Sequence, residues 1–285
     1  MIVYIVENLW WPFGCHLLHV KWNIIKAKKL GAKLVYKHNN HKTFPDGSVQ
    51  YYFQDWSDKI EVDDTVVNTH ASLCTDDVIG NYLLPNDCYA YTSVAEMHSS
   101  ILKTIYKPST IMQLLIDENV FLKSLPQEHE YIAMHVRWSD KVHGTNTETV
   151  IIHLSEYLKH AVSTRETNPL IKTIVLCTDN TEAFDELKKE NDKLACPFTL
   201  MYNENEERSQ NNMNDAIVQK ALRNMVDQDR LVRDYENGFI NFEIMINSYC
   251  IIANFDSGYC LVPVQLRNSS LDINVRNAKP LWGFS

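Results

Sequence analysis

The sequence predicts an α/β protein built around parallel sheets. A strand pattern, a helical pattern and a second strand pattern follow one another over residues 2–36, and such a unit brings its two strands together in parallel. From residue 131 onward, short apolar runs again alternate with amphipathic segments. Three of these later runs are followed by polar clusters, and ligands bind at the carboxyl ends of strands in open α/β sheets.

The first half of the chain supplies the opening unit and one further helix. Residues 2–6 are β-branched or aromatic, which favours a strand, and residues 32–36 have a similar character. Between them a glycine-containing loop leads into a helical pattern that ends in lysines before Gly31. A helix is also expected over residues 110–124, with apolar positions at Ile111, Leu114, Leu115, Val120 and Leu122.

The second half repeats the alternation of strands and helices. Strands are expected at residues 131–136, 171–177, 198–202 and 249–254, and helices at residues 151–165, 179–191, 215–223 and 238–248. A polar patch at residues 126–130 precedes this half. We therefore expect two domains, one over residues 1–126 and one over residues 127–285.

Composition excludes several classes of protein. The 285 residues carry a formal net charge of -9, which argues against a general nucleic-acid binder, because such proteins neutralise phosphates. No stretch is long and apolar enough for a transmembrane segment, and the N-terminus has no basic leader. Seven scattered cysteines without a C-x-x-C pair indicate a reducing compartment. We expect a cytoplasmic protein.

The stretch from Tyr131 to Lys141 concentrates the charge that a ligand site needs. Its apolar first half has the size of a buried strand, so Arg137, Asp140 and Lys141 fall at the carboxyl end of that strand. Arginine and lysine neutralise phosphate, and the aspartate can orient a cation or accept a substrate hydroxyl. A solvated turn with an ion pair is the alternative explanation.

Two motifs resemble those of one enzyme family. The run from His135 to Val142 is similar to the His-Val-Arg-x-x-Asp-Lys-Val donor-binding motif of the α1,6-fucosyltransferases and the Nod-factor fucosyltransferases. Trp138 departs from that motif, which has a second arginine there. Residues 14–20 resemble the family's Gly-Cys-x-Leu-x-His-Val stretch after the first strand. A glycine loop at a helix start offers backbone N–H groups to an anion.

The resemblance implies an architecture and a distribution of roles. It implies the GT-B architecture, with two Rossmann-like domains whose parallel sheets face each other across a cleft. Residues 1–126 would then hold the acceptor and residues 127–285 most of the donor. Soluble bacterial or viral members are the forms that this chain resembles.

The resemblance also assigns candidate site residues. Glu148 is the best candidate for the base that deprotonates the acceptor, although three extra residues precede it, so Asp140 and His143 stay open. Lys141 is grouped with them as catalytic. Glu243 resembles a carboxylate that reads guanine, or it forms a structural ion pair. The donor-binding candidates are Gly14, Cys15, His135, Arg137, Trp138, Asp179, Glu243, Asp256, Ser257 and Gly258.

The function that follows is inverting transfer of a sugar from a nucleotide-sugar donor to a glycan acceptor. The resemblance implies GDP-fucose as the donor, and UDP-xylose is the alternative because Trp138, Glu243 and Asp256 depart from the family. An inactive carbohydrate- or nucleotide-binding protein is the alternative of another class. The expected partners are a nucleotide-sugar donor and an oligosaccharide or glycoprotein glycan, without nucleic acid. No cofactor and no metal are expected, since the literal D-x-D at residues 227–229 would place its carboxylates on different helix faces.

Overall fold

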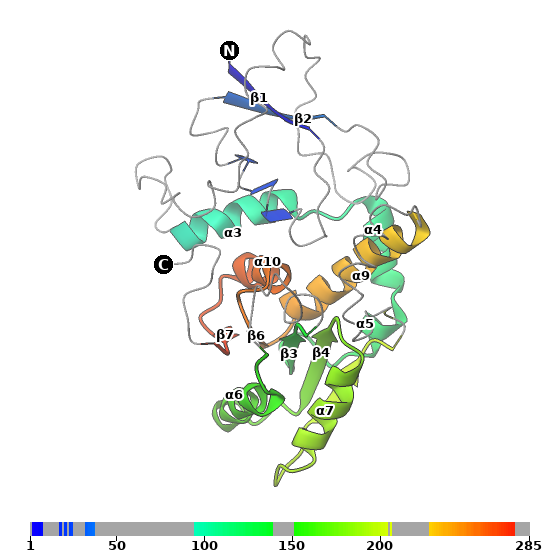
Figure 1. The fold of residues 1–285 in the computed structure, drawn as a ribbon, viewed down its shortest axis with the longest axis vertical. Coiled ribbons are helices and arrows are strands. Elements are labelled where there is room, and N and C mark those ends of the chain that lie inside the picture. The colour runs from blue at the N-terminus through cyan, green and yellow to red at the C-terminus, as the bar shows by residue number, and fades with distance from the viewer. Residues whose placement is uncertain are drawn as a thin grey trace.

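The computed structural model describes residues 2–7, 17–18, 20–21, 23–24, 32–37, 94–138, 151–204, 206 and 228–276. Within these ranges the chain forms a two-stranded sheet and a five-stranded sheet, with helices between successive strands (Figure 1). Every strand pair is parallel. The structure therefore confirms an α/β protein with parallel sheets.

The two-stranded sheet is the opening unit that the sequence predicts. Strand β1 (Ile2–Glu7) pairs with β2 (Ala32–Lys37), and residues 17–18, 20–21 and 23–24 between them are helical. A crossover helix is what allows consecutive strands to run parallel, because a tight turn would make them antiparallel.

The five-stranded sheet is built from the second half of the chain. Its strand order is β5-β4-β3-β6-β7, with β3 in the centre. The chain adds β4 and β5 on one side of β3 and then β6 and β7 on the other side. Four of these strands were predicted, whereas β7 has two residues and is too short to give a periodic signal. The strands are β3 (Tyr131–Val136), β4 (Thr173–Thr178), β5 (Thr199–Tyr202), β6 (Cys250–Ala253) and β7 (Ile273–Asn274).

Helices cover both faces of this sheet, and the alternation of side chains along β3 divides the core between them. Ile132, Met134 and Val136 pack with α6 (Leu154–Thr167) and α7 (Glu182–Asn191). Tyr131 and Ala133 point to the opposite face and pack with α9 (Gln228–Ile246) and α10 (Gly258–Arg267). Because side chains alternate along a strand, successive residues of β3 belong to different cores.

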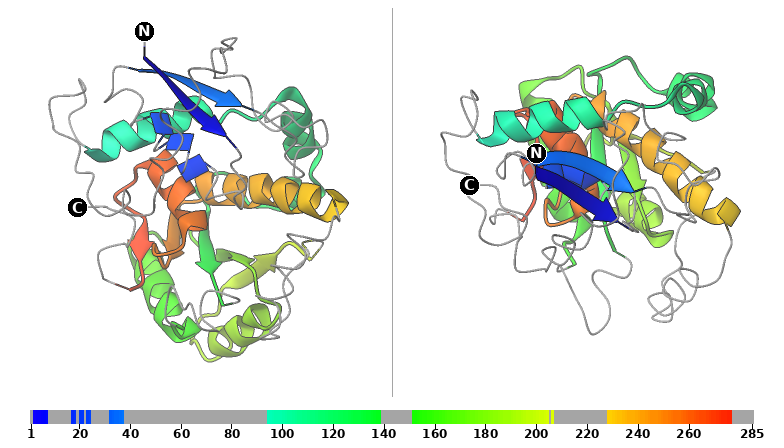
Figure 2. Two further views of the ribbon diagram at one scale, coloured as in Figure 1. Left: turned by 45° about the horizontal axis from the view of Figure 1, so that its top comes forward. Right: turned by 90° about the horizontal axis from the view of Figure 1, so that it is seen from above.

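Helices from the first half of the chain join the core on the α9 and α10 face. Leu17, Leu102 and Met112 belong to the same cluster of buried side chains as Leu261 of α10. Helix α3 (Val94–Ile105) lies beside α10 (Figure 2). The division into domains at residue 126 stays a prediction.

The helix expected over residues 110–124 is two helices, α4 (Thr110–Glu118) and α5 (Val120–Ser124). Asn119 interrupts it with an extended backbone, and its side-chain oxygen accepts the Leu122 N–H at 3.0 Å as the N-cap of α5. The expected apolar face is right in part, because Leu115 and Leu122 are half-buried and pack against the core. Met112 is the buried residue of α4, whereas Ile111, Leu114 and Val120 are exposed, at 51%, 57% and 81%.

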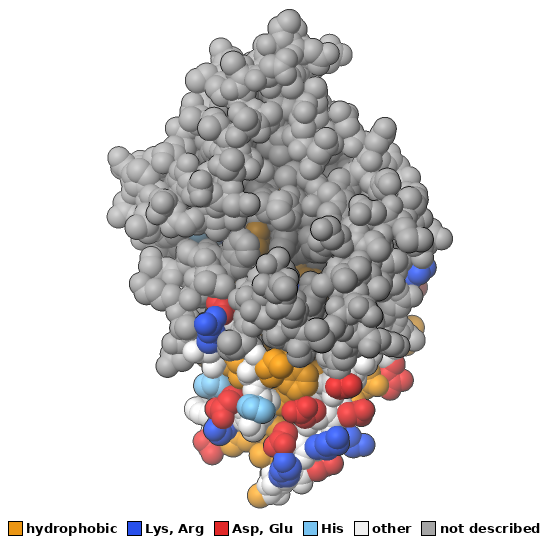
Figure 3. Space-filling model, viewed as in Figure 1, with side chains coloured by type: hydrophobic (Ala, Val, Ile, Leu, Met, Phe, Trp, Pro, Cys, Tyr) orange, Lys and Arg blue, Asp and Glu red, His pale blue; other side chains and the backbone are white. Residues whose placement is uncertain are grey.

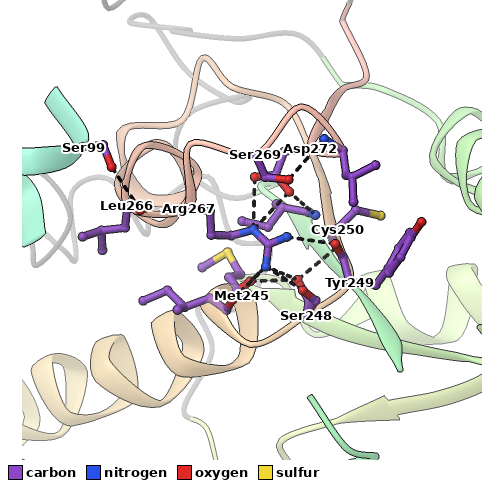
Figure 4. A network of polar contacts seen from close by, with 12 residues as sticks. Ser99, Met245, Ser248, Tyr249, Cys250, Leu266, Arg267, Ser269 and Asp272 are labelled. Atoms are coloured by element: carbon purple, nitrogen blue, oxygen red, sulfur yellow. Dashed lines mark hydrogen bonds and ion pairs between the residues drawn. The ribbon is translucent and has the colours of Figure 1, made fainter. Parts of the chain in front are cut away.

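Arg267 joins the end of α10 to the end of α9 (Figure 4). Its Nε lies 3.2 Å from both carboxylate oxygens of Asp272, and its Nη1 donates to the carbonyls of Ile246 and Ser248 at 2.7 and 2.6 Å. Nη2 donates to the Tyr249 carbonyl at 2.9 Å. The guanidinium thus satisfies carbonyls that the end of a helix leaves without partners, and it fixes where β6 begins.

The described surface over α6 and α7 carries charges of both signs (Figure 3). Glu156 pairs with Lys159 on α6, and Glu190 pairs with Lys193 beyond α7. Such exposed pairs contribute little to stability.

Among the described residues, no helix combines the length and the apolar character that crossing a membrane requires.

Candidate functional site

The order of the strands predicts where a ligand binds. Strands β3 and β6 are neighbours, but the chain goes from β3 to β4 on one side of the sheet and from β6 to β7 on the other. The place between β3 and β6 is therefore a switch point, and in doubly wound sheets the ligand binds there, outside the carboxyl ends of the strands. Arg137 follows β3, and residues 254–257 follow β6. We call this region the carboxyl edge.

Arg137 is held at the carboxyl edge by Asp179, the residue that follows β4. The Arg137 Nε lies 3.0 Å from Oδ2 of Asp179, and both side chains are partly exposed. The other carboxylate oxygen, Oδ1, accepts the backbone N–H of Trp138 at 3.0 Å. Asp179 therefore orients the arginine and the backbone beside it, and its direct role in donor binding stays a prediction.

The residues on either side of Asp179 hold the turn. Thr178 donates its hydroxyl to the Val136 carbonyl at 2.8 Å. The side-chain oxygen of Asn180 accepts the N–H groups of Glu182 and Ala183 at 2.7 and 3.2 Å and so caps α7. Within the polar cluster after β4, Asp179 is the residue that forms the ion pair with Arg137.

His135 shares its face of β3 with Arg137 and lies against α10. Its ring stacks on Tyr259 with centroids 5.5 Å apart and an interplanar angle of 18°. Burial lowers the pKa of His135 to about 4, and the nearby Arg137 adds to this while Asp179 opposes it. The imidazole is therefore neutral at pH 7, and within the described part of the chain its buried Nδ1 has no hydrogen-bond partner.

Trp138 lies on the opposite face from Arg137. Its side chain is 9% exposed and packs with Val136, Leu154 and Tyr157 in the core beneath α6. Trp138 is one of the donor-binding candidates, and the structure instead places its side chain in the core. The sequence indicated this placement, because successive side chains of an extended chain point to opposite faces of the sheet. Trp138 comes two residues after Val136 and shares its face, whereas Arg137 comes two residues after His135.

The turn after β6 brings Asp256, Ser257 and Gly258 to the carboxyl edge. Ser257 precedes α10, whose first N–H groups therefore point to this edge and favour an anion. The Asp256 side chain is almost fully buried and forms an ion pair with Arg276, the second residue after β7. Sequence reasoning missed Arg276, since nothing in the local pattern around it indicates a partner 20 residues earlier.

Glu243 contacts the side chains of Tyr106 and Asn247, and its role in reading guanine stays a prediction. Its Oε1 accepts the Tyr106 hydroxyl at 3.0 Å, and its Oε2 lies 3.3 Å from Nδ2 of Asn247. Burial raises the pKa of its carboxyl group. The following residue, Ile244, accepts the hydroxyl of Tyr131, the first residue of β3, at 2.8 Å. Glu243 is thus next to the amino ends of the strands, and the structure does not bring it to Arg137.

Several predicted residues lie outside the described part of the chain. They are Gly14, Cys15, Asp140, Lys141, His143 and Glu148. Their roles stay predictions. Within the described ranges, no group of three or more His, Cys, Asp or Glu side chains is arranged to hold a metal ion.

Comparisons with known proteins agree with the fold. No protein-family model matches the chain, and no curated protein is similar to it in sequence. Solved structures do match. A NodZ α-1,6-fucosyltransferase soaked with GDP-fucose is similar at a TM-score of 0.54 and 13% identity over 93% of both chains.

Two further solved structures extend this likeness. The fucosyltransferase NodZ from Bradyrhizobium has a TM-score of 0.53 and 13% identity over 92% of both chains. POFUT1 in complex with GDP has a TM-score of 0.51 and 10% identity, over 93% of this chain and 95% of the other. The chain therefore has an α/β fold with a parallel sheet that matches the GT-B fucosyltransferases.

Proposed function

We propose that this protein is a glycosyltransferase that takes a sugar from a nucleotide-sugar donor. The observation that carries the proposal is the position of Arg137, which Asp179 holds at the switch point of the sheet. Two sources of positive potential, the guanidinium and the N-terminus of α10, follow the adjacent strands β3 and β6. A nucleoside diphosphate is an anion that suits such an edge.

We propose GDP-fucose as the donor. Structures with this fold have been obtained with GDP-fucose for NodZ and with GDP for NodZ and POFUT1. The packing of Trp138 also supports this choice, because a tryptophan in the core does not reshape the donor site. Asp256 is paired with Arg276, so its charge does not oppose a diphosphate as strongly as its sequence position implies. UDP-xylose is correspondingly less favoured.

The proposed chemistry is a direct displacement with inversion at the anomeric carbon. An acceptor hydroxyl oxygen forms the new bond to that carbon while the bond to the diphosphate oxygen breaks, and a base takes the hydroxyl proton. Glu148, Asp140 or His143 would be that base, with Lys141 nearby in the sequence. Arg137 and the N–H groups at Ser257 and Gly258 would stabilise the negative charge of the departing diphosphate.

Diphosphate stabilisation of this kind needs no metal, and we propose a metal-independent reaction. The proposed acceptor is an oligosaccharide or a glycoprotein glycan. A matched pair of assays with EDTA and with added Mg²⁺ would test the first point, since equal turnover is expected in both.

The test is a binding and turnover panel. We expect GDP and GDP-fucose to raise the melting temperature more than UDP and UDP-xylose do, and GDP-fucose to be hydrolysed slowly without an acceptor. Arg137→Ala should reduce turnover by the equivalent of about 2–4 kcal/mol of transition-state stabilisation. Lys193→Gln, which removes one exposed charge beyond α7, is the control and should leave turnover unchanged.

Each alternative has its own outcome in this panel. Equal binding of GDP and UDP would contradict the proposed donor. Tight binding without hydrolysis or transfer would indicate a binding protein instead of an enzyme. Unchanged turnover in a folded Arg137→Ala variant would remove the basis of the proposal.

A further inference from the structure

We infer that Arg276 is a second cation of the donor site and binds the diphosphate together with Arg137. This inference rests on the proposed function and adds a specific residue to it. The ligand chemistry is that of a nucleoside diphosphate, or of pyrophosphate alone.

The first argument is position. Arg276 follows β7, which pairs with β6 on the side away from β3, so the loop after β6 lies between Arg137 and Arg276. Neighbouring strands are about 4.8 Å apart, which places the two backbones roughly 10 Å from each other across the sheet. The N-terminus of α10 begins in that loop. Two phosphates at this helix start would be flanked by a cation on each side.

The second argument is the way in which Arg276 is held. Asn274 accepts the backbone N–H groups of Phe255 and Arg276 at 3.2 and 3.3 Å through one oxygen, which joins the β7 turn to the β6 turn. Nη1 of Arg276 donates to Oδ2 of Asp256. A ligand that approaches this edge meets an arginine that is already oriented, so less side-chain entropy is lost on binding.

The third argument is the difference in exposure within the ion pair. The Asp256 side chain is 1% exposed, whereas that of Arg276 is 35% exposed. Solvent therefore meets the cation and not the carboxylate. A guanidinium has five N–H donors, and Asp256 takes only part of this capacity. Asp256 thus serves as the anchor of Arg276 and need not contact the ligand.

A separate observation on the same edge points to a ligand. His135 is 4% exposed, and in the described part of the structure its Nδ1 has no hydrogen-bond partner. Its ring lies against Tyr259 in the first turn of α10, between the strand that leads to Arg137 and the helix start. A buried polar atom without a partner is costly, and a bound ligand is one way in which that cost is relieved.

The experiment compares GDP, pyrophosphate and guanosine as ligands by calorimetry on four proteins. They are the wild type, Arg276→Lys, the double variant Asp256→Asn with Arg276→Gln, and the control Lys193→Gln. The double variant removes both charges together, so that no buried carboxylate is left without its partner. All four proteins are first compared by thermal unfolding.

The expected result is selective for the phosphates. The double variant should bind GDP and pyrophosphate at least about tenfold more weakly, while guanosine changes by less than about twofold. The slope of log Kd against log salt should decrease in the double variant, since one phosphate-neutralising cation is lost. Arg276→Lys should lose less affinity than the double variant, and Lys193→Gln should match the wild type.

Two results would overturn the inference while leaving the proposed function in place. One is unchanged GDP and pyrophosphate affinity in the folded double variant. The other is an equal loss for guanosine, which would give Arg276 a purely structural role. A wild type that binds pyrophosphate but not GDP would contradict the proposed donor, and the pyrophosphate series would still test Arg276. A wild type that binds neither would contradict both.

Discussion

The Nε of Arg137 lies 3.0 Å from Oδ2 of Asp179, which links the ends of two neighbouring strands. The same carboxylate accepts the N–H of Trp138, so the aspartate fixes both the arginine side chain and its backbone. Asp179 is therefore a positioning residue that acts through Arg137.

Asp179→Asn should lower turnover much more than it lowers the affinity for GDP. The amide keeps an oxygen for the Trp138 N–H but loses the charge that holds Arg137 in place. We expect GDP affinity to change by less than about threefold, because the arginine keeps its own charge. Turnover should fall about tenfold or more, because a misplaced cation no longer meets the departing diphosphate. Steady-state kinetics with GDP-fucose would show a lower kcat, and a lower affinity with unchanged kcat would contradict the role.

Trp138→Phe should change stability and not donor choice. The tryptophan packs in the core with Leu154 and Tyr157, so the smaller ring leaves part of its volume empty. We expect a loss of about 1–3 kcal/mol in the free energy of unfolding, measured with urea. The ranking of GDP-fucose and UDP-xylose in a donor panel should be that of the wild type. An altered ranking would place the side chain in the donor site.

Glu243→Gln should remove a pH dependence of stability and leave nucleotide binding intact. Because burial raises the pKa of the Glu243 carboxyl, the folded protein keeps its proton over a pH range where the unfolded chain has lost it. The contribution of Glu243 to stability therefore falls as pH rises above about 4.5, the ordinary value of the group. Unfolding of both proteins at several pH values should show a flatter profile for the variant. Loss of GDP binding would instead support the predicted role in reading guanine.

Lys21 should make the stability of the folded protein depend on pH with the opposite sign to Glu243. It is almost fully buried, its Nζ donates to Oε1 of Gln265 at 2.7 Å, and burial lowers its pKa to about 7 from 10.5. Between these values the unfolded chain binds more protons than the folded protein, so stability rises with pH. The wild type should gain roughly 2 kcal/mol relative to Lys21→Met between pH 7 and pH 9, since one pKa unit corresponds to about 1.4 kcal/mol.

The comparison with Lys21→Met isolates this lysine. Burial also raises the pKa of the Cys250 and Cys260 thiols, whose titration affects stability in the same alkaline range. Those contributions are common to both proteins and cancel in the difference. Parallel stability curves for the two proteins from pH 7 to pH 9 would contradict the prediction.

Much of the architecture was readable in the sequence because it is encoded locally. Apolar runs of strand length gave β3, β4 and β6, and their order with the intervening helices gave parallel sheets. The charge after β3 placed Arg137 at the carboxyl edge, since a strand's end fixes where the next residue lies. The break at Asn119 was missed because an N-cap inside an apolar pattern gives only a weak local signal.

The sequence by itself determined the strands β3, β4, β5 and β6 and the edge of the sheet on which the charged residues fall, since both follow from neighbours a few positions apart. Only the tertiary structure decided the partners. Asp179 meets Arg137 because β4 pairs with β3, and Arg276 meets Asp256 because β7 pairs with β6. Glu243 accepts a hydrogen bond from Tyr106, which lies 137 residues earlier in the chain. These pairings depend on how strands and helices that are far apart in the sequence pack together. The periodicity of the sequence does not indicate which residues meet in that packing.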